Sequence, residues 1–238
     1  MFDQTRLRSR IQRLLPVILV LWLIALVPAT RKLMAFEWST GATGLIPTRL
    51  STSASKGLTQ NDGRSALLVV AIHPLCSCTR ATLKELEDSA PGWKLPYHVT
   101  FLLYKAKSQS GSATPVSTHV SDFDWRHTAY IRDAQQALNA EVVEDLNGEQ
   151  AAKLGALTSG EVLLYSTPDP QGSRRLLFSG GVTAGRGMEG ENGSITALEQ
   201  AINAQNLNAA NSQPDAHAPV YGCGLAALSN RTSGGSSK

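Results

Sequence analysis

One stretch, SALLVVAIHPLCSCTRATLKEL at positions 65–86, constrains the fold of this chain more than any other. Residues Ala66–Ile72 are a short apolar run rich in β-branched side chains, which is the pattern of a strand buried on both faces. Pro74 ends this strand, because proline has no N–H to donate to a neighbouring strand and restricts the residue before it. The stretch therefore predicts a strand at the centre of a sheet.

A helical pattern begins shortly after this strand. Leu83, Leu86 and Ala90 recur at the spacing of one helix face. Thr82 and Glu85 have the spacing of a capping box, which marks a helix start. The predicted order is strand, thiol pair, helix.

Cys76 and Cys78 stand between the strand and the helix, with one residue between them. A helix N-terminus presents free N–H groups and the positive end of the helix dipole, and both favour a thiolate over a thiol. Side chains two positions apart on a helix point about 200° away from each other, so Cys76 must lie in the turn if the sulfurs are to meet. A disulfide across one residue would be strained and labile. The pair predicts redox or metal chemistry; the alternative is two small buried thiols.

The rest of the folded domain alternates between strand and helix patterns. The predicted elements, in chain order, are a strand at 98–104, a helix at 125–138, a strand at 141–144, a brief helix ending at 154–155, a hairpin of strands 161–166 and 175–179, and a helix at 194–207. Positions 105–122 are rich in Ser, Thr and Gly and predict a surface insertion. This order predicts an α/β domain at 64–207, with layers of helices around a mixed sheet.

The N-terminal segment predicts a transmembrane anchor. Positions 14–30, LLPVILVLWLIALVPAT, are 17 residues without a charge. This length is at the short limit for a membrane span. Four arginines at positions 1–13 outnumber Arg31 and Lys32 behind the span, so the positive-inside rule places 1–13 in the cytoplasm and the following domain outside the cytoplasmic membrane. A cleaved signal peptide is the alternative, because Val27-Pro28-Ala29 can pass as a cleavage site.

The formal net charge of +3 does not indicate a nucleic-acid partner. The basic segment at positions 1–13 accounts for this excess by itself, and the remainder of the chain balances at zero. The domain therefore has no basic face of the kind that binds nucleic acid.

Two segments flank the predicted domain. Positions 31–63 have Ser, Thr and Gly scattered without a period and predict a linker. Positions 208–238 form a polar tail, and its last part, Ser229–Lys238, is predicted to be disordered. Within the tail stands an apolar patch, Pro219–Leu225, that stays ordered only by docking. We therefore expect its Cys223 to lie close to Cys76 and Cys78; the alternative is a tail cysteine without contact to the pair.

Four stretches together resemble the RedB-like proteins of bacteria: HPLCSCTRATLKEL at 73–86, LGALTSGEVLLY at 154–165, LLFSGGVTAGRGMEG at 176–190 and PVYGCGL at 219–225. The resemblance covers about positions 63–225. It implies a membrane-anchored protein with a thioredoxin-like fold, in which Cys76 and Cys78 occupy the active-site position. It also leads us to expect a histidine where this chain has Met188.

The chain departs from ordinary thioredoxins at two places. Its thiols are separated by one residue instead of two, and the loop that normally carries a cis-proline opposite the thiols reads Thr158-Ser159-Gly160. A cis bond is rare without proline, so we expect a trans bond before Gly160 and a looser platform for an extended substrate. Both departures argue against ordinary disulfide-reductase behaviour.

The residues also allow metal chemistry. Copper(I) prefers soft thiolates, and two or three suffice, so Cys76, Cys78 and Cys223 are candidate ligands, with His73 or His217. Zinc is disfavoured because it usually needs four ligands and wider spacing between paired cysteines. Positions 185–190 fit G-x-G-x-x-G, but they stand too late in the chain for a dinucleotide site. We expect them to form a glycine-rich loop that folds back near the thiols instead.

The leading hypothesis is thiol–disulfide exchange without a cofactor. In it, Cys76 is the more exposed attacking thiol, Cys78 is its resolving partner, and Cys223 takes part. The expected partners are extracytoplasmic protein thiols or disulfides, with membrane lipid around the anchor. A copper(I)-binding module or metallochaperone using the same thiols is the alternative. A thioredoxin-like scaffold that only binds protein is the third possibility.

Overall fold

The structure is a computed structural model that describes residues 4–55, 57–58, 65–94, 96–106, 128–204 and 216–225. The chain forms two compact units, Met1–Ser39 and Thr40–Lys238. Most of the predicted insertion at 105–122, the start of the predicted helix at 125–138 and the tail at 229–238 lie outside the described residues.

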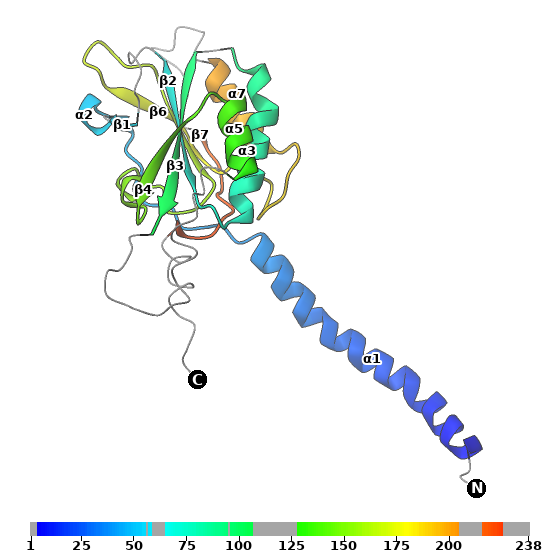
Figure 1. The fold of residues 1–238 in the computed structure, drawn as a ribbon. Coiled ribbons are helices and arrows are strands. Elements are labelled where there is room, and N and C mark those ends of the chain that lie inside the picture. Colours follow the sequence, from blue (N-terminus) through cyan, green and yellow to red (C-terminus); the bar gives the residue numbers. More distant parts are fainter. Residues whose placement is uncertain are drawn as a thin grey trace, which may run out of the picture. The chain divides into compact units, whose positions relative to one another are not determined.

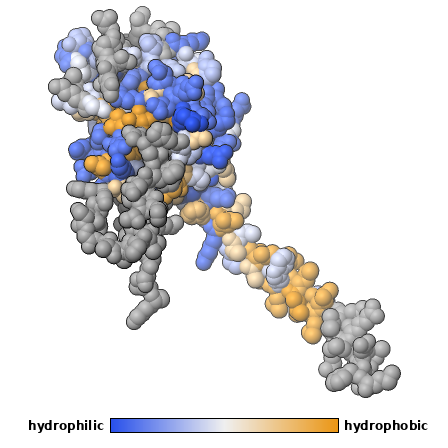
Figure 2. Space-filling model, viewed as in Figure 1, coloured by the Kyte–Doolittle hydropathy of each residue, from blue (hydrophilic) through white to orange (hydrophobic). Residues whose placement is uncertain are grey.

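The first unit contains a single described helix, α1 (Gln4–Glu37). The stretch from Leu14 to Glu37 has 24 residues, and an 18-residue window within it has a mean hydropathy of 2.2, which makes the helix long and apolar enough to span a membrane. At 1.5 Å per residue this stretch rises about 36 Å, against a hydrocarbon core of about 30 Å. The large apolar side chains along it are exposed (Figure 2). The predicted span at 14–30 lies within this helix, which continues through the first seven residues of the predicted linker.

The second unit is built on a mixed sheet (Figure 1). The described strands pair in the order β1-β6-β5-β2-β3-β4, and β7 also pairs with β6. Strands β2, β3 and β4 are parallel to one another, whereas β5 is antiparallel to β2 and β6 is antiparallel to β5. The strand bounds are β1 (Arg49–Leu50), β2 (Ala66–Ile72), β3 (Tyr97–Lys105), β4 (Glu141–Leu146), β5 (Glu161–Tyr165), β6 (Arg174–Gly180) and β7 (Ala216–His217).

Helices cover both faces of the sheet. On one face α3 (Ser77–Ser89), α5 (Ala129–Ala137) and α7 (Gly193–Ala204) lie side by side (Figure 1). The short helix α6 (Glu149–Lys153) contributes to the core on the other face. Two short segments complete the described elements, α2 (Thr52–Ser55) and a 3-10 turn, η1 (Ala90–Gly92). The predicted α/β fold with a mixed sheet and flanking helices is confirmed.

Strand β2 lies at the centre of both cores, as its continuous apolar run predicts. Leu68 and Val70 pack with Leu86 of α3 in the first core, while Leu67 and Val69 belong to the second core. All seven residues of β2 are buried. Because side chains alternate along a strand, each of these cores receives every second residue of β2.

Most of the predicted elements are present, with their ends moved by a few residues. The capping box was wrong, because α3 begins five residues before Thr82. Both of its residues are buried inside the helix, and Glu85 accepts a hydrogen bond from the Gly190 N–H instead. In the sequence, only the strand end at His73-Pro74 marked the true start of α3.

The predicted linker at 31–63 was wrong over much of its length. Its first residues continue α1, since no proline or glycine interrupts the helix there. From Thr40 the chain belongs to the second unit. There, Thr158 Oγ1 donates to the Ala42 carbonyl at 2.7 Å, and Leu50 is buried in the second core. The polar composition of this segment did not predict its backbone hydrogen bonds, because such bonds do not depend on side-chain polarity.

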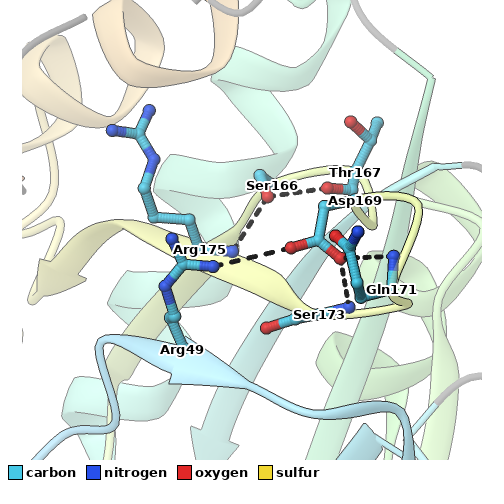
Figure 3. A network of polar contacts seen from close by, with 7 residues as sticks. All are labelled: Arg49, Ser166, Thr167, Asp169, Gln171, Ser173 and Arg175. Atoms are coloured by element: carbon cyan, nitrogen blue, oxygen red, sulfur yellow. Dashed lines mark hydrogen bonds and ion pairs between the residues drawn. The ribbon is translucent and has the colours of Figure 1, made fainter. Parts of the chain in front are cut away.

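One aspartate, Asp169, stabilises the turn of the hairpin between β5 and β6 through hydrogen bonds (Figure 3). Asp169 Oδ1 accepts hydrogen bonds from the Gln171 and Ser173 N–H groups at 3.0 and 2.8 Å, which is the local bonding that favours aspartate in turns. Its other oxygen lies 3.5 Å from Arg49 of β1. This contact joins the turn to the strand that extends the sheet beyond β6.

The C-terminal segment 216–225 docks on the second unit. Ala218 N–H donates to the Ser179 carbonyl at 3.0 Å, and Gly41 N–H donates to the Val220 carbonyl at 2.7 Å. Val220 and Leu225 are buried. Gly180 permits this contact, because a Cβ there would lie 2.2 Å from the Ala218 carbonyl oxygen. The predicted docking of the apolar patch is therefore present in the structure.

Candidate thiol site

The thiol pair lies where β2 ends and α3 begins. Cys76 is the N-cap of α3 with an extended backbone (φ −104°, ψ 122°), and Cys78 is in its first turn. The Cys76 N–H donates to the His73 carbonyl at 3.1 Å, which closes the turn after Pro74. The prediction that Cys76 lies in the turn and Cys78 on the helix is confirmed. Both side chains are buried, with 5% and 2% of their surface exposed, so neither is a readily accessible thiol.

The two thiols have opposite electrostatic environments. The pKa of Cys76 is lowered, chiefly because the Cys78 thiol donates a hydrogen bond to its sulfur. Burial opposes this shift, while the Cys223 N–H, the Ser159 side chain and the Thr79 N–H add to it. The pKa of Cys78 is raised by the same shared hydrogen bond and by burial. Cys76 is therefore the thiolate and Cys78 the protonated donor.

The loop Thr158–Gly160 faces the thiols, as the resemblance implied. Ser159 is fully buried; its hydroxyl lies 2.6 Å from that of Thr79 and accepts a hydrogen bond from the His73 N–H at 3.2 Å. The described residues contain no cis peptide bond, so the predicted trans bond before Gly160 is confirmed. Gly160 has a φ of +89°, which suits glycine.

Cys223 lies against this loop. The Ser159 N–H donates to the Cys223 carbonyl at 2.9 Å, and the Leu225 N–H donates to the Leu157 carbonyl at 2.9 Å. Together they form an antiparallel bridge between Thr158 and Gly224. The Cys223 N–H donates to the Cys76 sulfur, so the third cysteine reaches the pair from about 145 positions away. The structure thus places Cys223 close to Cys76, as predicted.

The glycine-rich loop at 185–190 closes the site from another side, as predicted. The Gly187 N–H donates to the Cys78 sulfur, and the Gly190 N–H donates to Glu85 of α3. Arg186 places Nη1 3.7 Å from the Cys223 sulfur. Met188, where a histidine was expected, packs against Gly185.

Two rings support the turn that carries the thiols. His73 is buried and stacks on Tyr104 with ring centroids 5.0 Å apart, and its Nδ1 accepts a hydrogen bond from the Leu75 N–H. Burial lowers the pKa of His73, so the ring is neutral there. The Tyr130 hydroxyl donates to the Pro74 carbonyl at 2.6 Å. His73 thus acts in the structure as part of the turn.

The proposed metal ligands are only partly brought together. Among the residues that the structure describes, no three His, Cys, Asp or Glu side chains are grouped in a way that can hold a metal ion. His217 lies on β7, where its Nδ1 is 2.6 Å from the Ser179 hydroxyl. The three-thiolate copper site is therefore not assembled, and a two-thiolate site at Cys76 and Cys78 is what remains of that alternative.

Glu161 is a buried acid that the sequence reasoning did not select. Its side chain is 0% exposed at the start of β5, and Oε2 accepts hydrogen bonds from the Leu157 and Thr158 N–H groups at 3.0 and 3.3 Å. Among the residues that the structure describes, its Oε1 has no hydrogen-bond partner. Burial raises the pKa of Glu161 to about 7, against the opposing effect of these two N–H groups. Glu161 therefore anchors the loop that holds Ser159.

Three further residues of the site were also missed as contributors, namely Tyr130, Ser159 and Arg186. Each acts through a contact across more than 30 positions of sequence, to Pro74, Thr79 and Cys223 respectively. Arg186 carried a usable signal, because it lies inside the glycine-rich loop predicted to fold back near the thiols. Ser159 carried one as well, because it lies in the loop Thr158–Gly160 that the resemblance places opposite the thiols, whereas Tyr130 carried none.

A scan against models of known protein families and a search of curated proteins give no match for this chain. Among solved structures, the chain is similar to a hypothetical protein, SMc02350, from Sinorhizobium meliloti 1021, with a TM-score of 0.43 and 17% identity over 79% of this chain and 94% of that one. It is also similar to an uncharacterized conserved protein from Geobacillus kaustophilus, with a TM-score of 0.44 and 12% identity over 79% of this chain and 93% of that one.

Proposed function

We propose that this chain is a membrane-tethered, extracytoplasmic thiol–disulfide exchange protein with a thioredoxin-like fold, related to the RedB-like proteins. The observation that carries the proposal is the environment of Cys76. Its sulfur sits at the N-terminus of α3 and accepts hydrogen bonds from the Cys78 thiol and the Cys223 N–H. Such surroundings favour the thiolate, which is the form that attacks a disulfide.

The order of elements supports the thioredoxin-like part of the proposal. Strand β2 runs directly into the thiol turn and α3, while the loop before β5 approaches the thiols from the opposite side. The single residue between the thiols and the absence of proline in that loop remain departures from ordinary thioredoxins. We therefore expect exchange with a restricted set of partners.

The chemistry needs no cofactor. A thiolate of the site attacks one sulfur of an incoming disulfide, so that one S–S bond forms as another breaks and the leaving thiolate takes up a proton. A second thiolate of the site then displaces the partner. In total, two cysteines of the chain lose two electrons and two protons, and the incoming disulfide becomes two thiols. The reverse sequence makes a disulfide in the partner.

The basic residues before the apolar helix support the membrane topology. In this proposal the apolar stretch of α1 from Leu14 spans the cytoplasmic membrane, positions 1–13 lie in the cytoplasm, and the thiol domain meets extracytoplasmic protein thiols or disulfides. A reporter that is active only outside the cytoplasm, fused after Lys238, is expected to be active and to stay in the membrane fraction. A soluble periplasmic product shortened by about 29 residues would identify a cleaved signal peptide instead.

A copper(I) module is the second candidate, and one observation favours it. Cys76 and Cys78 are buried and in direct hydrogen-bond contact, and two soft thiolates suffice for copper(I). In this role the pair would hold the ion between two sulfurs and pass it to an extracytoplasmic partner.

Thiol and metal counting on the full chain in detergent separates these candidates. Thiols and bound copper are measured before and after a reductant, with Cys76→Ser as the matched control. Reversible loss of two thiols that is abolished by Cys76→Ser supports exchange. Stoichiometric copper that protects two thiols supports the copper module. If neither occurs, the domain serves as a protein-binding scaffold and the proposed exchange is wrong.

A further inference from the structure

We propose that Cys223 is the thiol that meets the external disulfide, and that the bond formed in the oxidised chain joins Cys223 to Cys76 while Cys78 remains a hydrogen-bond donor. This inference rests on the proposed exchange function and names the order of its steps. It replaces our expectation that Cys76 is the exposed attacking thiol and Cys78 its resolving partner.

Access to the site favours Cys223 as the entry thiol. Cys76 and Cys78 expose 5% and 2% of their surface, whereas Cys223 is only partly buried. An attacking sulfur must reach an incoming disulfide in line, so a partly exposed thiol reacts first. Arg186 places its guanidinium 3.7 Å from the Cys223 sulfur, which favours a thiolate there.

Backbone pairing holds the main chain of Cys223 beside Cys76. The Cys223 N–H donates to the Cys76 sulfur, and the Cα of Cys223 is one bond of about 1.5 Å beyond that nitrogen. The carbonyl of the same residue is fixed by the Ser159 N–H. Gly222 makes this close approach possible, because a Cβ there would lie 2.0 Å from the Ser159 carbonyl oxygen.

Cys78 is unsuited to resolve the mixed disulfide. It lies in the first turn of α3, and its thiol is committed as donor to Cys76 while the Gly187 N–H contacts its sulfur. A bond to Cys76 would close a small ring across one residue and distort the start of the helix. A bond from Cys76 to Cys223 joins two segments that already lie side by side.

The steps balance with an external disulfide as oxidant. The Cys223 thiolate attacks the external disulfide and forms a mixed disulfide, and one external thiolate leaves with a proton. The Cys76 thiolate then attacks the Cys223 sulfur, which releases the second external thiol. Cys76 and Cys223 have together lost two electrons and two protons. The Cys78 thiol stabilises the Cys76 thiolate before the second step.

The test uses the full chain in detergent with oxidised glutathione as the probe. Trypsin leaves Cys76 and Cys78 together in the peptide Ser65–Arg80 and Cys223 in Gly187–Arg231, so without a reductant the predicted bond links two peptides. Linked peptides in the wild type and in Cys78→Ser are expected, because serine retains a donor to Cys76. Cys223→Ser is expected to lose thiols at least about tenfold more slowly.

Two outcomes would overturn the inference while leaving exchange intact. One is a wild-type bond confined to the peptide Ser65–Arg80; the other is Cys223→Ser oxidising as fast as the wild type. A wild type that retains all three thiols would overturn the exchange function as well. Arg186→Gln supplies a second reading, with oxidation about three- to tenfold slower, and Arg80→Gln on the exposed face of α3 is its control. Equal oxidation rates for these two variants would show that Arg186 does not activate Cys223.

Discussion

Replacing Glu161 by glutamine tests the buried carboxyl behind the site. Glutamine keeps the size of the side chain and an oxygen that accepts the Leu157 and Thr158 N–H groups, but it does not titrate. In the folded chain the pKa of Glu161 is raised to about 7 from an ordinary 4.5, because the side chain is 0% exposed. The folded state therefore binds more protons than the unfolded state between these two values.

The sign and size of the effect follow from proton linkage. Stability is highest at and below about pH 4.5, where Glu161 is protonated in both states. It falls as the pH rises toward about 7, and above that value the whole loss of roughly 3 kcal/mol is present, at about 1.36 kcal/mol for each pKa unit. Glu161→Gln escapes this loss, so the variant is expected to match the wild type near pH 4.5 and to exceed its stability by up to roughly 3 kcal/mol at pH 8.

Denaturant unfolding of a fragment beginning at Thr40, followed from pH 4.5 to pH 8, measures the difference. The exposed Glu191→Gln serves as control and is expected to follow the wild type at every pH. A constant offset between Glu161→Gln and the wild type across the range would refute the reasoning, since an unsatisfied amide alone costs about 1–3 kcal/mol at any pH. A variant less stable at pH 8 than at pH 4.5, relative to the wild type, would show that the carboxylate itself is stabilising.

Three further substitutions test the site and its support. Gly222→Ala places a Cβ 2.0 Å from the Ser159 carbonyl oxygen, so Cys223 should undock and react several-fold faster with a maleimide, whereas Gly193→Ala, with open space around its Cβ, should not change that rate. Ser159→Ala removes a hydrogen bond that lowers the pKa of Cys76, so the pH midpoint of its alkylation should rise; an unchanged midpoint contradicts the assignment. Leu86→Ala empties a fully buried position in the first core and should lower the free energy of unfolding by about 2–5 kcal/mol.

Local patterns predicted the centre of this fold well. The apolar run of β2, the proline that ends it and the repeated leucines of α3 each depend on residues close in sequence. The turn residues between β5 and β6 predicted their hairpin for the same reason, and Asp169 shows how the turn is held. The segment at 40–50 escaped prediction because backbone hydrogen bonds attach much of it to distant residues such as Gly155 and Val220, and such bonds leave no mark on composition.

The site was predictable only where chemistry and chain order coincided. Cys76 and Cys78 could be selected from their residue type and spacing. Cys223 could be selected because it lies in an apolar patch within a polar tail. What the sequence does not reveal is the direction in which hydrogen bonds run between the three thiols. That direction depends on Arg186, Gly187 and Ser159, which meet the cysteines only in the folded chain. The fold thereby makes three similar residues unequal: a thiolate at Cys76, a donor at Cys78, and at Cys223 a partly buried residue whose sulfur lies beside the Arg186 guanidinium.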